Sequence, residues 1–346
     1  MGTFKDVYAK LTQLKDPVTG ETLFKLGLMK DISLESNRLT LTLIAATDDE
    51  MRNFENMVLD AVKEFNLDKI EINKVYKEIV RPNLEKREKI KERKIEGVKK
   101  VIAVGSGKGG VGKSTVAANL AGALSLQGLQ VGLFDGDIYG PSISRMFGID
   151  GLAPMVEDNK MIPAKRFGLK IMSMGQLVEE EKPVLWRGPL IHKAYEQFLY
   201  DTNWAPLDVL VIDLPPGTGD AQLSAIQLIE LDGSIIVTTP QDVSLIEVKK
   251  AINMFRSQGV TILGVIENMS YYKCDNCGEI SHIFGTGGAK KLQETMDVEI
   301  LGELPVHPLL SISGDEGLPI IFREEDNEPK RIFFDIARKI INKLEI

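Results

Sequence analysis

The stretch Gly107-Lys108-Gly109-Gly110-Val111-Gly112-Lys113-Ser114 decides the fold of this 346-residue chain. It fits the P-loop pattern, and it follows an apolar run, Val101 to Val104, that is typical of a short buried strand. A helix rich in Ala and Leu is expected from Thr115 to Gln127. In a strand, loop and helix of this kind, backbone N–H groups and the positive end of the helix dipole face nucleotide phosphates. The sequence therefore predicts a nucleotide site here.

Each residue of the loop has an expected task. Lys113 is expected to reach the β- and γ-phosphates of ATP, and the Ser114 hydroxyl to bind the Mg²⁺ that bridges the phosphate oxygens. A glycine-rich turn without nucleotide is the alternative, and the flanking strand and helix argue against it. The residues expected to contact nucleotide are Gly107, Lys108, Gly109, Gly110, Val111, Gly112, Lys113, Ser114 and Thr115.

A second lysine, Lys108, follows the first glycine of the loop. With it, the loop resembles the deviant Walker A motif of the MinD/ParA/NifH/Mrp group of ATPases. The resemblance implies a homodimer in which Lys108 crosses to the partner's nucleotide, while Lys113 acts within its own subunit. Positive charge that arrives only when two subunits meet would tie hydrolysis to dimerisation.

Length and composition bound the answer further. A chain of this length allows about two domains, and 43% hydrophobic residues is ordinary for a globular protein. No uncharged apolar run reaches the ~18 residues needed to span a bilayer, and Met1 to Lys30 lacks a secretory signal, so we expect a cytoplasmic protein. A net charge of -8 argues against a nucleic-acid partner.

Residues 1–76 are predicted to form a small α/β accessory domain. The order of their expected helices and strands resembles the domain fused to some Mrp-type ATPases and found in SufT-like iron–sulfur assembly proteins. The matching sequence segments are Asp16-Pro17 and Leu26-Gly27-Leu28. A cysteine common in that family is replaced by Ala46 to Glu50, so we expect a docking role rather than a metal site. The expected elements are a helix over 5–14, strands over 28–34, 38–45 and 69–75, and a helix over 50–65 capped by Asp48.

Residues 77–97 are crowded with Lys, Arg and Glu and are predicted to be an exposed linker. A basic nucleic-acid arm is the alternative, and the interleaved acids argue against it. Residues 98–346 are predicted to be the ATPase domain, a doubly wound parallel α/β sheet whose ligands bind at the carboxyl ends of the strands. The near-continuous apolar strands expected in it are 129–135, 209–214, 233–239 and 262–269.

Carboxylates follow two of these strands. By resemblance to MinD/ParA-type ATPases, Asp137 is expected to orient or activate the attacking water, and Asp135 to give structural or magnesium-shell support. A plain polar turn is the alternative for this pair. Val209 to Asp213 fits the Walker B pattern, in which Asp213 would hold Mg²⁺ through its water shell.

Two further segments carry the resemblance. Pro215 to Asp220 resembles switch II of Mrp-type proteins, where Gly217 would approach the γ-phosphate and move after hydrolysis. Asn268 resembles the base-recognition residue of the group and is expected to bond the adenine. The loop from Pro305 to Pro308 is expected to close over the base.

Cys274 and Cys277, the two cysteines of the chain, form one Cys-x-x-Cys. Zinc and 4Fe-4S clusters usually take four protein ligands, so one chain is two ligands short, whereas a two-fold dimer supplies four thiolates. Mrp/ApbC iron–sulfur carriers use such a pair in this way. Zinc held with the help of His282, a redox dithiol, and a purely structural loop are the alternatives. His192 and His307 are expected at the polar surface.

The resemblance to Mrp/ApbC-type ATPases, which covers 98–346, implies an ATP-dependent carrier that transfers a 4Fe-4S cluster to apo-proteins. A MinD/ParA-type organiser acting on membrane or DNA is the rival, as is a NifH-like reductase, although NifH places its cluster cysteines far apart in sequence. The one feature that favours the organiser is the amphipathic stretch from Lys330 to Ile346, because a basic amphipathic terminal helix binds membrane in MinD. Here we expect this helix instead to cover the sheet as ordinary core, since Asp335 and Glu345 dilute its charge.

Overall fold

The computed structural model describes residues 4–18, 21–35, 37–77, 94–177, 188–274 and 276–346. The chain divides into two compact units, Met1–Lys89 and Ile90–Ile346. Most of the predicted linker, residues 78–93, lies outside the described residues.

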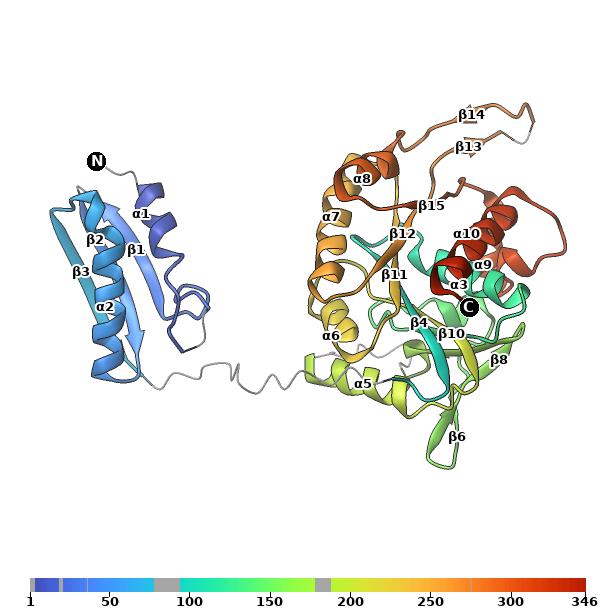
Figure 1. The fold of residues 1–346 in the computed structure, drawn as a ribbon, viewed down its shortest axis with the longest axis horizontal. Helices are drawn as coiled ribbons and strands as arrows, with labels where there is room; N and C mark the ends of the chain where they lie inside the picture. The colour runs from blue at the N-terminus through green and yellow to red at the C-terminus, as the bar shows by residue number, and fades with distance from the viewer. Residues whose placement is uncertain (1–3, 19–20, 36, 78–93, 178–187, 275) are drawn as a thin grey trace. The chain divides into compact units, whose positions relative to one another are not determined.

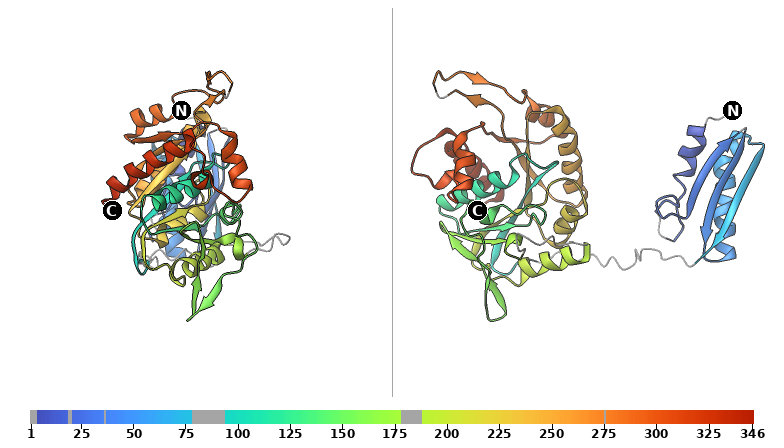
Figure 2. Two further views of the ribbon diagram at one scale, coloured as in Figure 1. Left: turned by 90° about the vertical axis from the view of Figure 1, so that its right-hand side faces the viewer. Right: turned by 180° about the vertical axis from the view of Figure 1, so that it is seen from behind.

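The described strands of the first unit form a three-stranded sheet in the order β1-β2-β3. Strand β1 (Met29–Glu35) is antiparallel to β2 (Arg38–Ala45), whereas β3 (Lys69–Tyr76) is parallel to β2. The parallel connection runs through α2 (Asp48–Val62) and the 3-10 turn η1 (Lys63–Phe65), and α2 lies with α1 (Phe4–Leu11) on one face of the sheet (Figures 1 and 2). The predicted elements are therefore present.

One detail of the first unit corrects the sequence analysis. Thr47, not Asp48, caps α2: its hydroxyl accepts a hydrogen bond from Glu50 N at 3.3 Å, and the Glu50 carboxylate accepts one from Ala46 N at 2.7 Å. This reciprocal pattern is close to a capping box, because a hydroxyl and a glutamate three residues apart satisfy each other's free amides. Asp48 lies in the first turn instead.

Eight strands of the described part of the second unit form one sheet, in the order β15-β12-β11-β4-β10-β5-β9-β8. Neighbouring strands are parallel except at the edge, where β8 is antiparallel to β9. The predicted doubly wound parallel sheet is confirmed. Its strands are β4 (Val98–Ser106), β5 (Val131–Asp135), β8 (Ala164–Arg166), β9 (Leu169–Ser173), β10 (Leu207–Asp213), β11 (Gly233–Thr238), β12 (Ile262–Glu267) and β15 (Ile300–Glu303).

Helices cover both faces of this sheet, and each layer has its own apolar core (Figure 1). The central strands are buried on both sides, as their uninterrupted apolar sequences predict. One layer holds α5 (Gly188–Tyr200), α6 (Asp220–Leu228), α7 (Asp242–Ser257) and α8 (Gly288–Met296). The other holds α3 (Lys113–Leu126), α4 (Ile143–Met146), α9 (Pro308–Asp315), η4 (Ile320–Phe322) and α10 (Glu328–Leu344).

Two small hairpins project from the body of this unit (Figures 1 and 2). One consists of β6 (Met155–Glu157) and β7 (Lys160–Ile162), and the other of β13 (Tyr272–Lys273) and β14 (Ile280–Ser281), which brackets the Cys-x-x-Cys. The 3-10 turn η3 (Met174–Leu177) follows β9.

Helix α10 is part of the core. Phe333, Ile336 and Ile340 are fully buried against the α3 layer, and Asn327 caps the helix by accepting from Lys330 N at 2.9 Å. The apolar stripe that would serve a membrane-binding helix is thus covered by the protein itself. Across the described residues, no helix is both long enough and apolar enough to cross a membrane.

Candidate functional site

The P-loop borders a cavity of about 270 Å³ at the carboxyl ends of the central strands. This is the place where open parallel sheets bind ligands. Seven of the nine loop residues predicted to contact nucleotide line it, whereas Gly107 and Val111 do not. The other predicted nucleotide residues, Asp213, Gly217 and Asn268, are also absent from the lining. The lining residues are Ser106, Lys108, Gly109, Gly110, Gly112, Lys113, Ser114, Thr115, Asp137, Gly140, Ser142, Met146 and Pro216.

Glycines of the loop serve two different purposes. A Cβ at Gly107 would lie 2.4 Å from the main chain of Glu247, so this glycine lets α7 approach the loop. A Cβ at Gly109 or Gly110 would meet nothing within 4 Å, and Gly110 has a left-handed φ of +76°. The open space over these two residues leaves their backbone accessible to a ligand, as phosphate binding requires.

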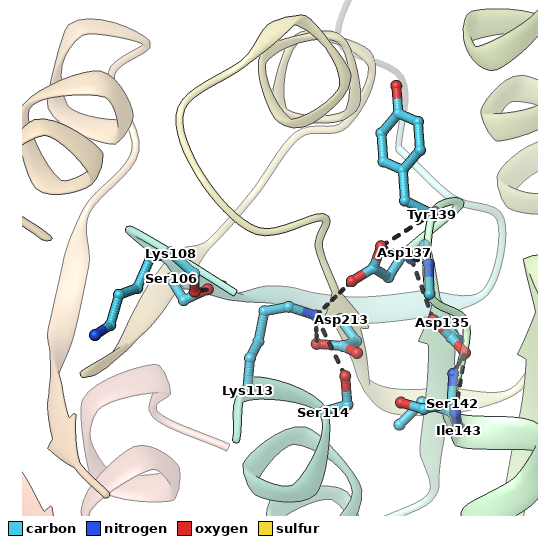
Figure 3. A network of polar contacts seen from close by, with 12 residues as sticks. Ser106, Lys108, Lys113, Ser114, Asp135, Asp137, Tyr139, Ser142, Ile143 and Asp213 are labelled. Carbon is cyan, nitrogen blue, oxygen red and sulfur yellow. Dashed lines mark hydrogen bonds and ion pairs between the residues drawn. The ribbon is translucent and has the colours of Figure 1, made fainter. Parts of the chain in front are cut away.

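Lys113 is buried at the floor of the cavity and is held by carboxylates (Figure 3). Its Nζ lies 2.6 Å from Asp213 Oδ1 and 3.5 Å from Asp137 Oδ2. Burial opposes the ammonium form, but the charges of Asp213 and Asp137 outweigh it, so the pKa of Lys113 is raised. Lys113 is therefore a permanent cation in this site.

Asp135 organises the turn that follows β5. Its Oδ2 accepts from Ser142 N and Ile143 N, both at 3.0 Å, and from the Ser173 hydroxyl at 2.9 Å. Burial and then the charge of Asp213 raise the pKa of Asp135 to about 7, against the hydrogen bonds that favour its ionised form. These contacts support the structural role predicted for Asp135, because they hold the segment that carries Asp137.

Asp213 has capacity for one more partner. Its Oδ1 is paired with Lys113, whereas its buried Oδ2 has no hydrogen-bond partner among the described residues. Burial raises the pKa of Asp213 despite the ammonium beside it. Lys113 pairs with Asp137 and Asp213, and Asp135 adds a third carboxylate nearby, so the cluster carries excess negative charge when all three are ionised. An orphaned carboxylate oxygen next to the Ser114 hydroxyl fits a hydrated Mg²⁺.

Lys108 does not join this cluster. Its ammonium is directed away from Lys113 (Figure 3) and donates to Gln241 Oε1 at 3.1 Å. Gln241 is the N-cap residue of α7, and Val243 and Ile246 in the first turns of that helix are 71% and 60% exposed. The lysine therefore sits at the rim of the site, beside an exposed apolar surface.

Cys274 and Cys277 lie at the turn of the β13–β14 hairpin. Two backbone hydrogen bonds close this turn: Cys274 N donates to Glu279 O at 2.9 Å, and Gly278 N donates to Cys274 O at 2.8 Å. Cys277 is exposed and Cys274 is half-buried. We call residues 270–283, less residue 275, the cysteine arm. Its tip presents two thiols on a fixed turn.

A second cavity of about 270 Å³ adjoins the arm. The loop after β15 and the first turn of α10 supply its other walls, so residues far apart in sequence meet beside Cys274. The lining is Lys273, Cys274, Gly278, Pro305, Val306, His307 and Glu328. The loop that was expected to cover a nucleotide base thus borders the cysteine arm, where the ring of His307 also caps α9 by accepting from Leu309 N at 3.2 Å.

His282 directly follows β14, and its Nδ1 is 3.1 Å from Ser270 O. Within the described residues, no group of three or more His, Cys, Asp or Glu side chains is arranged to hold a metal ion. Zinc held by both thiols and His282 in one chain therefore has no support in the geometry.

Sequence motifs identified the P-loop residues and the aspartates of the site. Several residues that contact the site or the cysteine arm belong to no motif. Gln241 meets Lys108 across 133 positions, and Glu328 meets Tyr271 across 57. Gly217 has a left-handed φ of +91° and donates its N–H to Ser106 O at 3.0 Å, while Asn268 lies behind the P-loop. Apolar periodicity could not have revealed these polar pairs.

A family model described as the NUBPL iron-transfer P-loop NTPase, of ParA type, matches residues 97–341. The chain belongs to this family. It is 36% identical to an iron–sulfur cluster carrier protein of Synechocystis over 100% of this chain and 99% of that one. It is 48% identical to a protein of the same name from Aquifex aeolicus, over 73% of this chain and 70% of that one. The predicted resemblance is confirmed.

Solved structures similar to this chain support the same fold. A nucleotide-binding protein from Archaeoglobus fulgidus, in complex with ADP, is 40% identical, with a TM-score of 0.61 over 71% of this chain and 96% of that one. The cell division ATPase MinD from Pyrococcus furiosus is 23% identical with a TM-score of 0.55, over 70% of this chain and 99% of that one. The second likeness concerns the fold alone, whereas the first extends to a protein solved with a nucleotide.

Proposed function

We propose that this protein is an ATP-dependent carrier that binds a 4Fe-4S cluster and transfers it to apo-proteins. The observation that carries the proposal is the placement of both thiols of the chain on the exposed tip of one hairpin, on a P-loop NTPase of an iron-transfer family. The relatives from Synechocystis and Aquifex aeolicus are named iron–sulfur cluster carriers, and this chain matches them over most or all of their length.

The cluster is cargo, and its ligands come from two chains. Cys274 and Cys277 of each subunit supply two thiolates, so a two-fold homodimer supplies the four that such a cluster usually takes. The exposure of Cys277 supports this arrangement, because a thiol meant for a shared cluster must face the partner. A cluster held at such an interface is released when the interface opens, which suits delivery to a recipient.

The nucleotide site is assigned residue by residue. Gly107 to Thr115 form the phosphate cradle, with Lys113 on the phosphates of its own subunit. Mg²⁺, held by Ser114 and through water by Asp213, would neutralise phosphate charge. Asp137 orients the attacking water, since its carboxylate lines the cavity 3.5 Å from Lys113 Nζ. Gly217 senses the γ-phosphate, and Lys108 reaches the partner's nucleotide.

The remaining assignments concern the whole molecule. We assign residues 1–76 to an accessory docking domain, 77–97 to a charged linker and 98–346 to the ATPase domain. Docking by the accessory domain would present recipient proteins to the cluster. We expect the carrier to act in the cytoplasm, where thiols stay reduced.

Transfer to a recipient tests the proposal. The full chain is reconstituted anaerobically with iron and sulfide, freed of small solutes and mixed with an apo-protein whose activity needs a 4Fe-4S cluster. We expect recovery of recipient activity from the loaded protein and none from a Cys274→Ala, Cys277→Ala double variant. Equal recovery from both would overturn the proposal, as would binding of zinc in place of iron.

A further inference from the structure

The chain that leads into the cysteine arm contacts the P-loop through a buried side chain, that of Asn268. This residue is 5% exposed, and its Nδ2 donates to Val111 O at 2.9 Å. A Cβ at Gly112, whose φ is +80°, would lie 2.2 Å from the same nitrogen, so the amide fills the space that this glycine leaves free. Asn268, expected to read the base, thus packs on the backbone of the phosphate cradle.

The contact is aimed at a peptide that borders the nucleotide cavity. Val111 C=O and Gly112 N–H are the two ends of one planar trans peptide, so they point in opposite directions. Gly112 lines the cavity, and Asn268 holds the carbonyl end of that peptide. An anion that attracts the N–H polarises the peptide and strengthens its carbonyl as an acceptor, because linked hydrogen bonds reinforce each other.

Asn268 is joined to the thiols by a short and well-tied stretch of chain. Ser270 N donates to Leu304 O at 2.9 Å, and Val306 N donates to Tyr271 O at 2.7 Å, so the base of the arm is bonded to the exit of β15. The turn at Cys274 is closed by its own hydrogen bonds. A shift at the base is therefore carried to the tip rather than absorbed along the way.

Two further side chains, the buried Glu267 and the half-buried Tyr271, bind the base of the arm to α8 and α10. The Glu267 carboxylate accepts from the Ser270 hydroxyl at 2.6 Å and from Ala289 N, at the start of α8, at 2.5 Å. The Tyr271 hydroxyl donates to Glu328 at the start of α10, at 2.8 Å. Among these contacts at the base, the bond from Asn268 is the one that ends on the P-loop.

We propose that Asn268 is a positioning residue that couples occupancy of the P-loop to the placement of Cys274 and Cys277. Its use in regulating cluster release rests on the proposed carrier function, but the coupling itself needs only the nucleotide site and the thiols. Bound nucleotide strengthens the Val111–Asn268 bond and fixes the arm, and an empty cradle loosens it. By linkage, the state of the thiols in turn affects nucleotide affinity.

The test measures thiol alkylation in the full chain without cluster. The rate at which iodoacetamide modifies Cys274 and Cys277 is followed by mass spectrometry, with and without Mg·ATP at a concentration shown by titration to saturate each variant. We expect Mg·ATP to change the wild-type rate by about 5-fold or more, the lower end of common allosteric couplings. Asn268→Ala, and Asn268→Asp, which lacks the donor, should show the same rate in both conditions.

Tyr271→Phe is the matched control. It frees the arm from α10 at the same base and leaves the P-loop contact intact, so it should shift both rates together and keep their ratio. If Asn268→Ala only loosened the arm in general, both alkylation rates would change, and the ratio of the rates with and without Mg·ATP would stay as in the wild type. Nucleotide dependence retained in both Asn268 variants, or absent from the wild type, would overturn the inference. Failure of the wild type to bind a cluster would instead overturn the proposed function, and the alkylation result would stand.

Discussion

The phosphate pocket and the cysteine arm differ in how much of each site one chain supplies. In the pocket, the buried Lys113 already faces the carboxylates of Asp137 and Asp213, and the glycine cradle is formed. On the arm, two thiols stand on an exposed turn, with no third metal-binding side chain grouped with them among the described residues. A site complete in one chain binds its ligand regardless of assembly, whereas a half-site binds only when a partner completes it.

The largest expected effect is at the half-site. Cys277→Ala should abolish stable cluster binding, because one thiolate per chain leaves a dimer with two of the four ligands such a cluster usually takes. Nucleotide affinity, measured by calorimetry, should be unchanged. Asn276→Ala, on the same turn, is the control and should keep the cluster. A full complement of iron and sulfide in the Cys277→Ala protein would contradict the claim that each chain supplies half of a four-thiolate cluster site.

The trans role of Lys108 tests whether the pocket too depends on a partner for its chemistry. Lys108→Ala should bind ATP normally but hydrolyse it about 10³-fold more slowly or worse, the range for a charge supplied across an interface. Mixing it with Asp137→Ala chains should restore one working site per mixed dimer, which steady-state phosphate release would detect. Without recovery in the mixture, Lys108 acts in its own chain and the pocket is complete by itself.

Lys113→Ala should damage the pocket from within. It removes the cation that pairs with Asp213 and leaves a buried carboxylate without its partner, so unfolding of the ATPase unit should cost about 3–5 kcal/mol less. Chemical denaturation followed by tryptophan fluorescence measures this, since Trp204 is buried in the same unit. Lys108→Ala is the matched control, because Lys108 sits at the rim, and its stability should stay within about 0.5 kcal/mol of the wild type.

The smallest effect concerns pH. The pKa of Asp135 is about 7 in the folded protein, above its unfolded value of about 3.9, so between these values the folded state binds a proton that the unfolded state has lost. Its contribution to stability is present at low pH and is lost as the pH rises through 7, with a slope of at most about 1.4 kcal/mol per pH unit. Asp135→Asn, which cannot titrate, should show a flatter profile from pH 5 to 8 in the same denaturation assay, and an unchanged slope would contradict the assignment.

The two sites also differ in how well the sequence predicts them. The cradle, the acids and the cysteine pair were predicted because each is a short local motif beside a strongly apolar strand. Three contacts were not predicted, because each joins residues more than 90 positions apart. They are the ion pair of Lys113 with Asp213, the hydrogen bond from Lys108 to Gln241 and the packing of Asn268 on the P-loop. Short strands such as β8 and β9 also escaped, since a few residues give too little periodicity to recognise.

Counting iron and sulfide against chains tests the central claim most directly. After anaerobic reconstitution and removal of unbound metal, the full-length protein is separated by size, its mass is measured by light scattering, and iron, sulfide and protein are determined in the same fraction. One 4Fe-4S cluster shared by two chains predicts a dimer with about two irons and two sulfides per chain. About four irons per chain in a monomer, or a dimer that holds zinc and no sulfide, would contradict it.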